Sequence, residues 1–206
     1  MAIYKLTPTK ANLIKSKNSL QFAKKGFELL DKKRTVLIRE MMSRIDDSTE
    51  LQERINHEFA SLYELIKLAN ITIGSGEVYD LAHSIRPEED FEILFRSVMG
   101  VEIPDVKFED KNLTPEYGFH RTNPAFDKAV IKAHEIKKLS YELAATENAV
   151  YRLAVEIKKT QKRTNALEKI QIPKYTETIK YIEDVLDEKE REDFFRLKKV
   201  KSKKRK

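Results

Sequence analysis

The chain has 206 residues, of which 36% are charged and 9% aromatic, and it has no tryptophan, a composition that argues against one compact, thick core. It has no cysteine, which excludes disulfide bonds and thiolate metal sites and is typical of a cytosolic protein. No run of 18 apolar residues is present, and lysines interrupt residues 1–20, so we expect neither a membrane span nor a signal peptide.

The net charge of +6 is concentrated at the C-terminal end. The last 11 residues, RLKKVKSKKRK, include eight basic side chains and no acidic one, whereas the rest of the chain is slightly acidic. An acidic stretch from Glu183 to Asp193 lies just upstream of them. The pattern predicts a basic tail over residues 196–206 and no basic face on the body, and the tail is expected to be either frayed and solvated or in contact with a protein partner.

Residues 1–70 are predicted to form one long coiled-coil helix. Thr7 is a candidate N-cap and Pro8 suits the first helical position, so the helix is expected to start at Pro8. Apolar residues then recur in steps of three and four over about eight heptads, which is typical of a coiled-coil seam. The seam includes Leu13, Leu20, Ala23, Phe27, Leu30, Leu37, Met41, Ile45, Leu51, Ile55, Phe59, Leu62, Leu65, Ile66 and Ala69.

Residues 71–122 contain most of the glycines and prolines and are predicted to form a small central insert. A turn at Gly74–Gly76 and a short helix ending at Ser84 come first. Two apolar stretches, 91–98 and 101–108, flank Met99-Gly100 and predict a β-hairpin, with Pro104 indicating an edge strand or a bulge. A hairpin this small requires support from a neighbouring helix.

Residues 123–195 are predicted to form the second coiled-coil helix, with an N-cap at Thr122-Asn123 and Pro124 at the first helical position. Its apolar seam runs from residue 126 to 167 and resumes from residue 175 to 197. Pro173 removes a hydrogen bond and its ring clashes with the carbonyl of residue 169. A kink or a short break is therefore expected near residues 169–172.

The insert joins two long helices, each with an apolar seam. The simplest way to bury both seams is to pack the two helices against each other. The predicted fold class is therefore mainly α: a long antiparallel two-helix coiled coil with a small central insert that contains a β-hairpin. If both helices are straight, facing residues have numbers that sum to roughly 194. This places Gly26 opposite about Glu168 and Met1 opposite about Asp193.

Polar residues are predicted at a few seam positions. Arg34 falls in the apolar series of the first helix, and the pairing places it opposite Thr160 and Thr164. Such residues weaken a seam but fix its register, because a slipped alignment would set them against apolar side chains. The alternative is that Arg34 only extends along the seam to bring its charge to solvent.

The sequence contains no recognisable catalytic, cofactor-binding or metal site. The four histidines lack HxxxH or HExxH spacing, and no cysteine is present to complete a site. Gly74-Ser75-Gly76 is not followed by the Lys-Ser/Thr pair of a phosphate loop, and no nucleophile with an adjacent base is apparent. We therefore expect a protein that is not an enzyme and needs no cofactor.

Four segments, in this order and spacing, carry a resemblance to a known family: TPTKANLIKSKNSLQFAKKGFELLDKKRTVL, VMGVEIP, KRTNALEKIQIP and DEKEREDFFRLKKVK. Together they resemble the D subunit of the A-type and V-type rotary ATPases. The resemblance covers nearly the whole chain, and its specificity lies in the four segments taken together. The chain departs from the family pattern at Thr164, where a branched apolar residue such as valine is expected.

The resemblance implies a non-catalytic rotor shaft that couples ion translocation in a membrane ring to ATP synthesis or hydrolysis. The implied partners are the catalytic A and regulatory B subunits, which form a hexamer, the small F subunit, and the funnel-shaped subunit above the membrane ring. The implied location is peripheral, on the cytoplasmic face of the membrane. The candidate partner-binding residues lie near the free end of the hairpin: Lys10, Leu13, Leu20, Gly26, Leu30, Arg34, Arg163, Asn165, Leu167, Glu168, Pro173, Arg191, Arg196, Lys198 and Lys199.

Two other functions fit parts of the pattern. A prefoldin-like chaperone also combines two long coiled-coil helices with an internal β-hairpin, but it assembles as a hexamer through its hairpins and does not require the charged C-terminal end. A nucleic-acid adaptor could act through the basic tail, although the body offers neither aromatic platforms nor a basic stripe.

Overall fold

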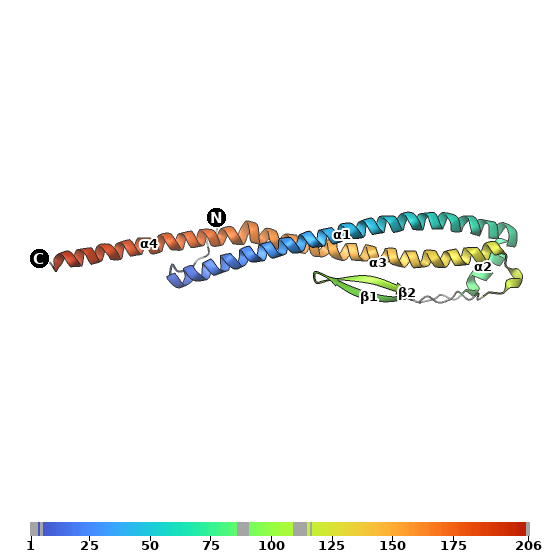
Figure 1. The fold of residues 1–206 in the computed structure, drawn as a ribbon, viewed down its shortest axis with the longest axis horizontal. Helices are drawn as coiled ribbons and strands as arrows, with labels where there is room; N and C mark the ends of the chain where they lie inside the picture. The colour runs from blue at the N-terminus through green and yellow to red at the C-terminus, as the bar shows by residue number, and fades with distance from the viewer. Residues whose placement is uncertain (1–3, 5, 86–90, 109–114, 116, 205–206) are drawn as a thin grey trace. The chain divides into compact units, whose positions relative to one another are not determined.

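Two long helical stretches with a two-stranded hairpin between them make up the computed structural model of the chain (Figure 1). The structure describes residues 4, 6–85, 91–108, 115 and 117–204. Its elements in chain order are α1 (Lys10–Ile73), α2 (Ser75–Ser84), β1 (Phe91–Val98), β2 (Val101–Phe108), the 3-10 turn η1 (Phe119–Arg121), α3 (Pro124–Ala166), the π-helical turn η2 (Leu167–Gln171) and α4 (Ile172–Lys203). The predicted fold class, mainly α with antiparallel helices and a β-hairpin insert, is confirmed.

The chain divides into two compact units. Unit 1 consists of Met1–Thr35 and Ile157–Lys206, and unit 2 consists of Val36–Glu156. Unit 1 therefore contains the start of α1, the end of α3, η2 and α4, whereas unit 2 contains the rest of α1 and α3, together with α2 and the hairpin.

In unit 1, α1 and α4 run antiparallel. Lys10 pairs with Glu190 at 2.9 Å, and Lys17 pairs with Glu183 at 2.7 Å, so residue numbers rise on one helix as they fall on the other. All four side chains are largely exposed, so solvent screens these ion pairs and they contribute little to stability. The main stabilisation comes from the buried seam between the helices, which contains Ser16, Ala23, Thr160, Thr164, Thr178, Ile179 and Ile182.

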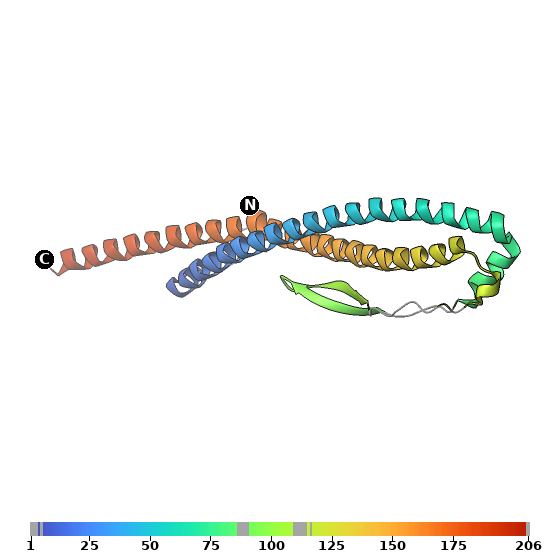
Figure 2. The same ribbon diagram turned by 45° about the vertical axis from the view of Figure 1, so that its right-hand side comes forward.

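In unit 2, α1 and α3 lie side by side and antiparallel (Figures 1 and 2). Gln52 donates to Glu147 at 3.2 Å, and Glu58 forms an ion pair with Lys132 nearer the insert. The seam residues between the helices are buried, and they include Leu37, Ile55, Leu62, Ala69, Ala129, Ile136, Leu139, Ala149 and Leu153. Most belong to the predicted seam, because the steps of three and four bring one face of each helix against the other.

The start of α1 differs from the prediction by two residues. The helix begins at Lys10, since the Thr9 hydroxyl accepts a hydrogen bond from the Asn12 amide at 3.2 Å and so acts as the N-cap. The Asn12 side chain in turn donates to the Thr7 carbonyl oxygen at 2.8 Å. The predicted start at Pro8 is wrong because Thr9, and not Thr7, caps the helix.

The start of α3 follows the sequence signal. Asn123 caps the helix, because its side-chain oxygen accepts a hydrogen bond from the Phe126 amide at 2.9 Å, and Pro124 occupies the first helical position. At the other end of the insert, α1 continues to Ile73 and stops at Gly74, whose φ of 101° is accessible at low cost only to glycine.

The insert contains the predicted hairpin. β1 and β2 are antiparallel, and Met99 and Gly100 both have positive φ, 50° and 80°, as a two-residue type I′ turn requires. The Phe91 ring stacks on Tyr141 of α3 with 4.6 Å between centroids. Arg152 of α3 donates to the Glu102 carbonyl at 3.1 Å, so α3 provides the support that such a small hairpin needs.

Pro173 follows the π-helical turn η2. A proline lacks the amide hydrogen and clashes with the carbonyl four residues earlier, which here belongs to Lys169. A π-turn widens the helix by one residue and relieves this conflict. Ala166 and Ile172, which flank the turn, keep α-helical dihedral angles, so the helix is not broken. A kink at this point stays a prediction.

Candidate functional site

No cluster of metal-ligating side chains is found among the residues that the structure describes. In that part of the chain, no three His, Asp or Glu side chains gather as a metal site would require. None of the described helices is long and apolar enough to cross a membrane. The candidate site considered below is a surface that can contact other proteins.

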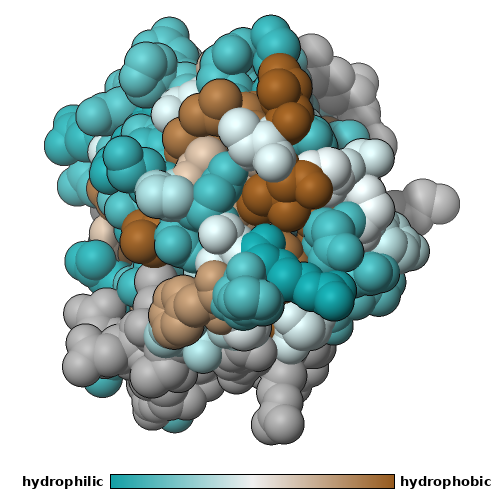
Figure 3. Space-filling model, turned by 90° about the vertical axis from the view of Figure 1, so that its right-hand side faces the viewer, coloured by the Kyte–Doolittle hydropathy of each residue, from teal (hydrophilic) through white to brown (hydrophobic). Residues whose placement is uncertain are grey.

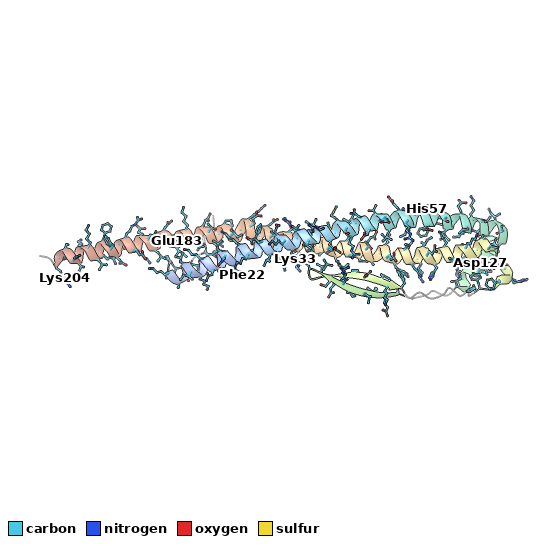
Figure 4. The ribbon with its side chains drawn as sticks, viewed as in Figure 1. Phe22, Lys33, His57, Asp127, Glu183 and Lys204 are labelled. Carbon is cyan, nitrogen blue, oxygen red and sulfur yellow. The ribbon has the colours of Figure 1, made fainter. Side chains whose placement is uncertain are left out.

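Unit 1 carries a set of exposed apolar side chains. Two of them, Phe194 and Leu197, were predicted to lie in the seam of the second helix, and that prediction is wrong because they are 64% and 68% exposed. On α1, Ile14, Phe22 and Leu29 recur at intervals of eight and seven residues and are 61%, 81% and 68% exposed. Figure 4 labels Phe22 on this face of α1. We call the whole set the unit 1 apolar surface; it consists of Ile14, Phe22, Leu29, Ile170, Tyr181, Phe194, Phe195, Leu197 and Val200.

Exposed apolar patches are a feature of surfaces that contact other proteins, so this set is the candidate contact surface of unit 1. The α1 stripe was not predicted, because a single seam was assigned to each helix. The signal was present in the sequence, since Phe22 and Leu29 form a seven-residue repeat beside the seam positions Leu20, Phe27 and Leu30.

The C-terminal half of α4 is exposed on all sides. Every residue from Arg191 to Lys204 is exposed, and the helix continues to Lys203. Arg196 pairs with Glu192 at 3.4 Å and with Asp193 at 3.6 Å within the same helix. Of the two expectations for the tail, a frayed end does not fit residues 196–203, which are helical and are stabilised by i,i+3 and i,i+4 pairs between the acidic and basic stretches; contact with a protein partner stays a prediction.

A polar layer crosses the seam of unit 1. The Arg34 guanidinium donates to Gln161 Oε1 at 2.5 Å and forms an ion pair with Asp31 at 2.7 Å. Gln161 donates in turn to Asn165 Oδ1 at 2.9 Å. The predicted pairing placed Arg34 opposite residue 160, one position from its actual partner. The Arg34–Gln161 contact favours a role in register over simple extension to solvent.

Two buried threonines flank this layer. Thr160 and Thr164 are 1% and 2% exposed, and the Thr164 hydroxyl donates to the Thr160 carbonyl at 2.9 Å. That bond satisfies the hydroxyl within its own helix, so Thr164 can replace the expected branched apolar residue without an unpaired polar group.

The predicted partner-binding residues separate into two groups. Half-buried seam positions leave little side-chain surface for a partner: Leu13, Leu20, Gly26, Leu30, Arg34, Asn165, Leu167 and Pro173. Exposed positions remain available: Lys10, Arg163, Glu168, Arg191, Arg196, Lys198 and Lys199. A Cβ added at Gly26 would meet only Leu167 Cδ1, at an ordinary 3.9 Å, so close packing does not require a glycine there. Partner contact by any of them stays a prediction.

The N-terminal segment turns back along α4. The Tyr4 amide donates to Thr178 Oγ1 at 3.1 Å, and the Tyr4 ring lies 4.8 Å from that of Tyr175. The Lys174 ammonium lies 4.0 Å from the centre of the Tyr4 ring. Burial, followed by the adjacent Tyr175, raises the pKa of Tyr4. No pattern in the sequence indicates this reversal, and straight pairing would have placed Tyr4 near residue 190; Met1 lies outside the described residues.

Unit 2 contains an apolar cavity of about 910 Å³ between the end of α1, α2 and the start of α3. Figure 3 shows this end of unit 2, where hydrophobic patches lie among hydrophilic residues. Phe126 and Leu81 belong to the core beside it, and the Tyr117 ring packs edge-on against Phe126. The Tyr117 hydroxyl donates to Asp127 Oδ1 at 2.9 Å, and burial, followed by this hydrogen bond, raises the pKa of Tyr117 to about 12.

Comparison with known proteins identifies relatives over nearly the whole chain. Residues 12–202 match the family described as the ATP synthase D subunit. The V-type ATP synthase D subunit of Thermotoga neapolitana is 42% identical over 198 residues, 96% of this chain and 98% of that protein. The A-type ATP synthase D subunit of Pyrococcus furiosus is 36% identical over 203 residues, 97% of this chain and 95% of that protein.

Proposed function

Because the chain belongs to the ATP synthase D subunit family, we propose that it is the non-catalytic central-stalk subunit of a rotary A/V-type ATPase or ATP synthase. In this role it transmits torque between the membrane ring and the hexamer of A and B subunits. Nucleotide chemistry takes place on the hexamer. The complex holds the chain peripherally at the cytoplasmic face of the membrane.

The observation that carries this proposal is the unit 1 apolar surface. A shaft that turns inside a ring of similar subunits must present different contacts to each of them in each orientation. The exposed apolar side chains of unit 1 come from two different helices: Phe22 and Leu29 lie on α1, and the exposed aromatic residues lie on α4. Different sides of the unit therefore expose different side chains. Differential contact of this kind shifts the conformational populations of the nucleotide sites as the shaft turns.

The small F subunit is proposed to bind unit 2. In that unit α1 exposes Ile38, Met42 and Ile45, spaced as i, i+4 and i+7 along one face of the helix. An apolar stripe with this spacing suits a partner helix. The cavity beside α2 is proposed to receive apolar side chains of the funnel-shaped subunit above the membrane ring, because its lining is largely apolar.

Purification of the tagged chain from native membranes tests the class of function. We expect the A, B and F subunits to copurify. If they are absent and the chain forms a hexamer with itself, the result would support a prefoldin-like chaperone. Steeply salt-dependent binding of DNA or RNA, lost on deletion of residues 198–206, would instead support the nucleic-acid adaptor.

A pair of matched variants tests the role of the apolar surface. Phe22→Ser removes an exposed aromatic side chain, whereas Gln21→Ser changes the exposed polar residue next to it. We expect Phe22→Ser to assemble but to lower coupled ATP hydrolysis, and Gln21→Ser to behave as wild type. Equal activity of the two variants would argue against contact at this surface.

A further inference from the structure

The two strands of the hairpin are not equally protected. β2 carries the buried side chains Val101 and Ile103 and also Pro104, whereas β1 exposes three consecutive apolar side chains, Ile93, Leu94 and Phe95. The sheet has only these two strands in the described part of the chain, so the outer edge of β1 has no partner strand there, although the Phe91 and Phe95 rings of β1 contact Tyr141 and Arg152 of α3. An apolar edge strand without proline or lysine is a template for pairing with another strand.

The turn defines which backbone groups of β1 face outward. In a two-residue hairpin the residues that flank the turn, here Val98 and Val101, form a hydrogen-bonded pair. Hydrogen bonding to β2 then alternates along β1, so the amide and carbonyl groups of Ile93, Phe95 and Ser97 point away from β2. A partner strand must align with these odd-numbered residues.

The exposed edge of β1 is complementary to itself. If two β1 strands pair antiparallel about Leu94, each Ile93 faces Phe95 of the other copy. The backbone amide and carbonyl groups of these two residues point away from β2 in both copies and can therefore bond across the new contact. Glu92 then faces Arg96 of the other copy, and Leu94 faces Leu94. Both charged side chains are exposed, and cross-strand pairs of opposite charge stabilise a sheet whereas like charges destabilise it.

We propose that two copies of this chain, while outside the ATP synthase, pair through β1 into a two-fold antiparallel dimer centred on Leu94. The pairing converts two hairpins into one four-stranded sheet and covers the apolar edge of both. A two-fold contact is closed, so it protects the edge without leading to open-ended aggregation. It concerns the unassembled chain and leaves the proposed role in the complex unchanged.

Charge reversal tests the pairing and its register. The full-length chain is expected to sediment as a dimer at micromolar concentration. Glu92→Arg and Arg96→Glu should each weaken the dimer about tenfold, because each variant sets two pairs of like charges against each other. The double variant Glu92→Arg/Arg96→Glu should restore dimerisation, since every pair is again of opposite charge. A wild-type monomer, or single and double variants that dimerise alike, would overturn the proposal.

A cysteine scan gives an independent test, because the chain has no cysteine of its own. At Leu94 the two copies face each other across the two-fold axis in a pair whose Cα atoms lie about 4.5 Å apart, within reach of a disulfide. Leu94→Cys should therefore oxidise to a covalent dimer. Asp105→Cys is the matched control, since Asp105 is exposed and faces Leu94 from β2. Equal cross-linking at both positions would overturn the proposal.

Discussion

Arg34 and Gln161 meet across the seam of unit 1, where the guanidinium donates to the side-chain oxygen at 2.5 Å. Arg34 Nε is buried and has no acceptor among the described residues, so the layer is held mainly by the bonds to Gln161 and Asp31. A half-buried polar layer of this kind costs stability relative to an apolar one but disfavours a shifted register.

A double-mutant cycle tests whether Arg34 and Gln161 stabilise each other. Arg34→Met leaves Gln161 without its partner and should lower the free energy of unfolding by about 1 kcal/mol. The double variant Arg34→Met/Gln161→Leu should regain most of that loss, because both facing polar groups are replaced and the partners that remain, Asp31 and Asn165, are partly exposed and can bind water. Urea unfolding of the four proteins of the mutant cycle measures both effects. Strictly additive changes would show that the two side chains do not interact.

Pro173→Ala should stabilise unit 1. Alanine restores the missing amide hydrogen and removes the clash with the Lys169 carbonyl, which together account for up to about 3 kcal/mol in a helix interior. The expected gain is about 1–2 kcal/mol, because the π-turn already relieves part of the conflict. Urea unfolding measures it, with Gln171→Ala as a control that alters η2 but keeps the proline. A destabilised Pro173→Ala protein would contradict this account of the turn.

The Tyr117–Asp127 pair predicts a loss of stability at alkaline pH. The pKa of Tyr117 is raised from 10.0 to about 12, first by burial and then by its hydrogen bond to Asp127. The folded state therefore favours protonated Tyr117. The stabilisation that this tyrosine gives to the folded state is fully present below pH 10 and is lost as pH rises toward about 12. Tyr117→Phe should abolish this part of the pH dependence, as thermal melts across that range would show. An unchanged alkaline slope would exclude Tyr117 as its source.

Thr178 and Thr176 offer a matched test of the N-terminal reversal. Both hydroxyls donate to the carbonyl four residues earlier, but only Thr178 also accepts the Tyr4 amide. Thr178→Val should therefore raise hydrogen exchange at Tyr4 and in residues 6–9 and cost about 1 kcal/mol of unfolding free energy, whereas Thr176→Val should leave exchange there unchanged. Equal exchange in both variants would show that this bond does not hold the segment.

The sequence was most informative where a local pattern decides the structure. The repeat of apolar residues determined which helix faces meet, Asn123 and Pro124 marked the start of α3, and Met99-Gly100 marked the turn. The pairing estimate came within one residue at Arg34, because both helices are regular between the insert and that point.

The remaining features depend on contacts between distant segments. Nothing in residues 4–9 predicts that Tyr4 will lie beside Thr178, since that position results from the surface that α4 presents. The π-turn was expected only as a kink or break, because a proline signals conflict with a helix and not the way in which the helix relieves it. The exposed stripe of Ile14, Phe22 and Leu29 on α1 was not predicted. A second apolar stripe on a helix can be recognised only once the residues that form the buried seam are known.

Cross-linking from residue 22 in the assembled complex tests the central claim most directly. Phe22→Cys provides a unique thiol in this chain, to which a photoreactive maleimide can be attached, and Glu53→Cys on α1 of unit 2 is the control. The shaft assignment predicts that irradiation joins position 22, but not position 53, to an A or B subunit and that ATP hydrolysis then stops. Adducts to A or B that leave hydrolysis at the rate of the same labelled complex before irradiation would contradict it.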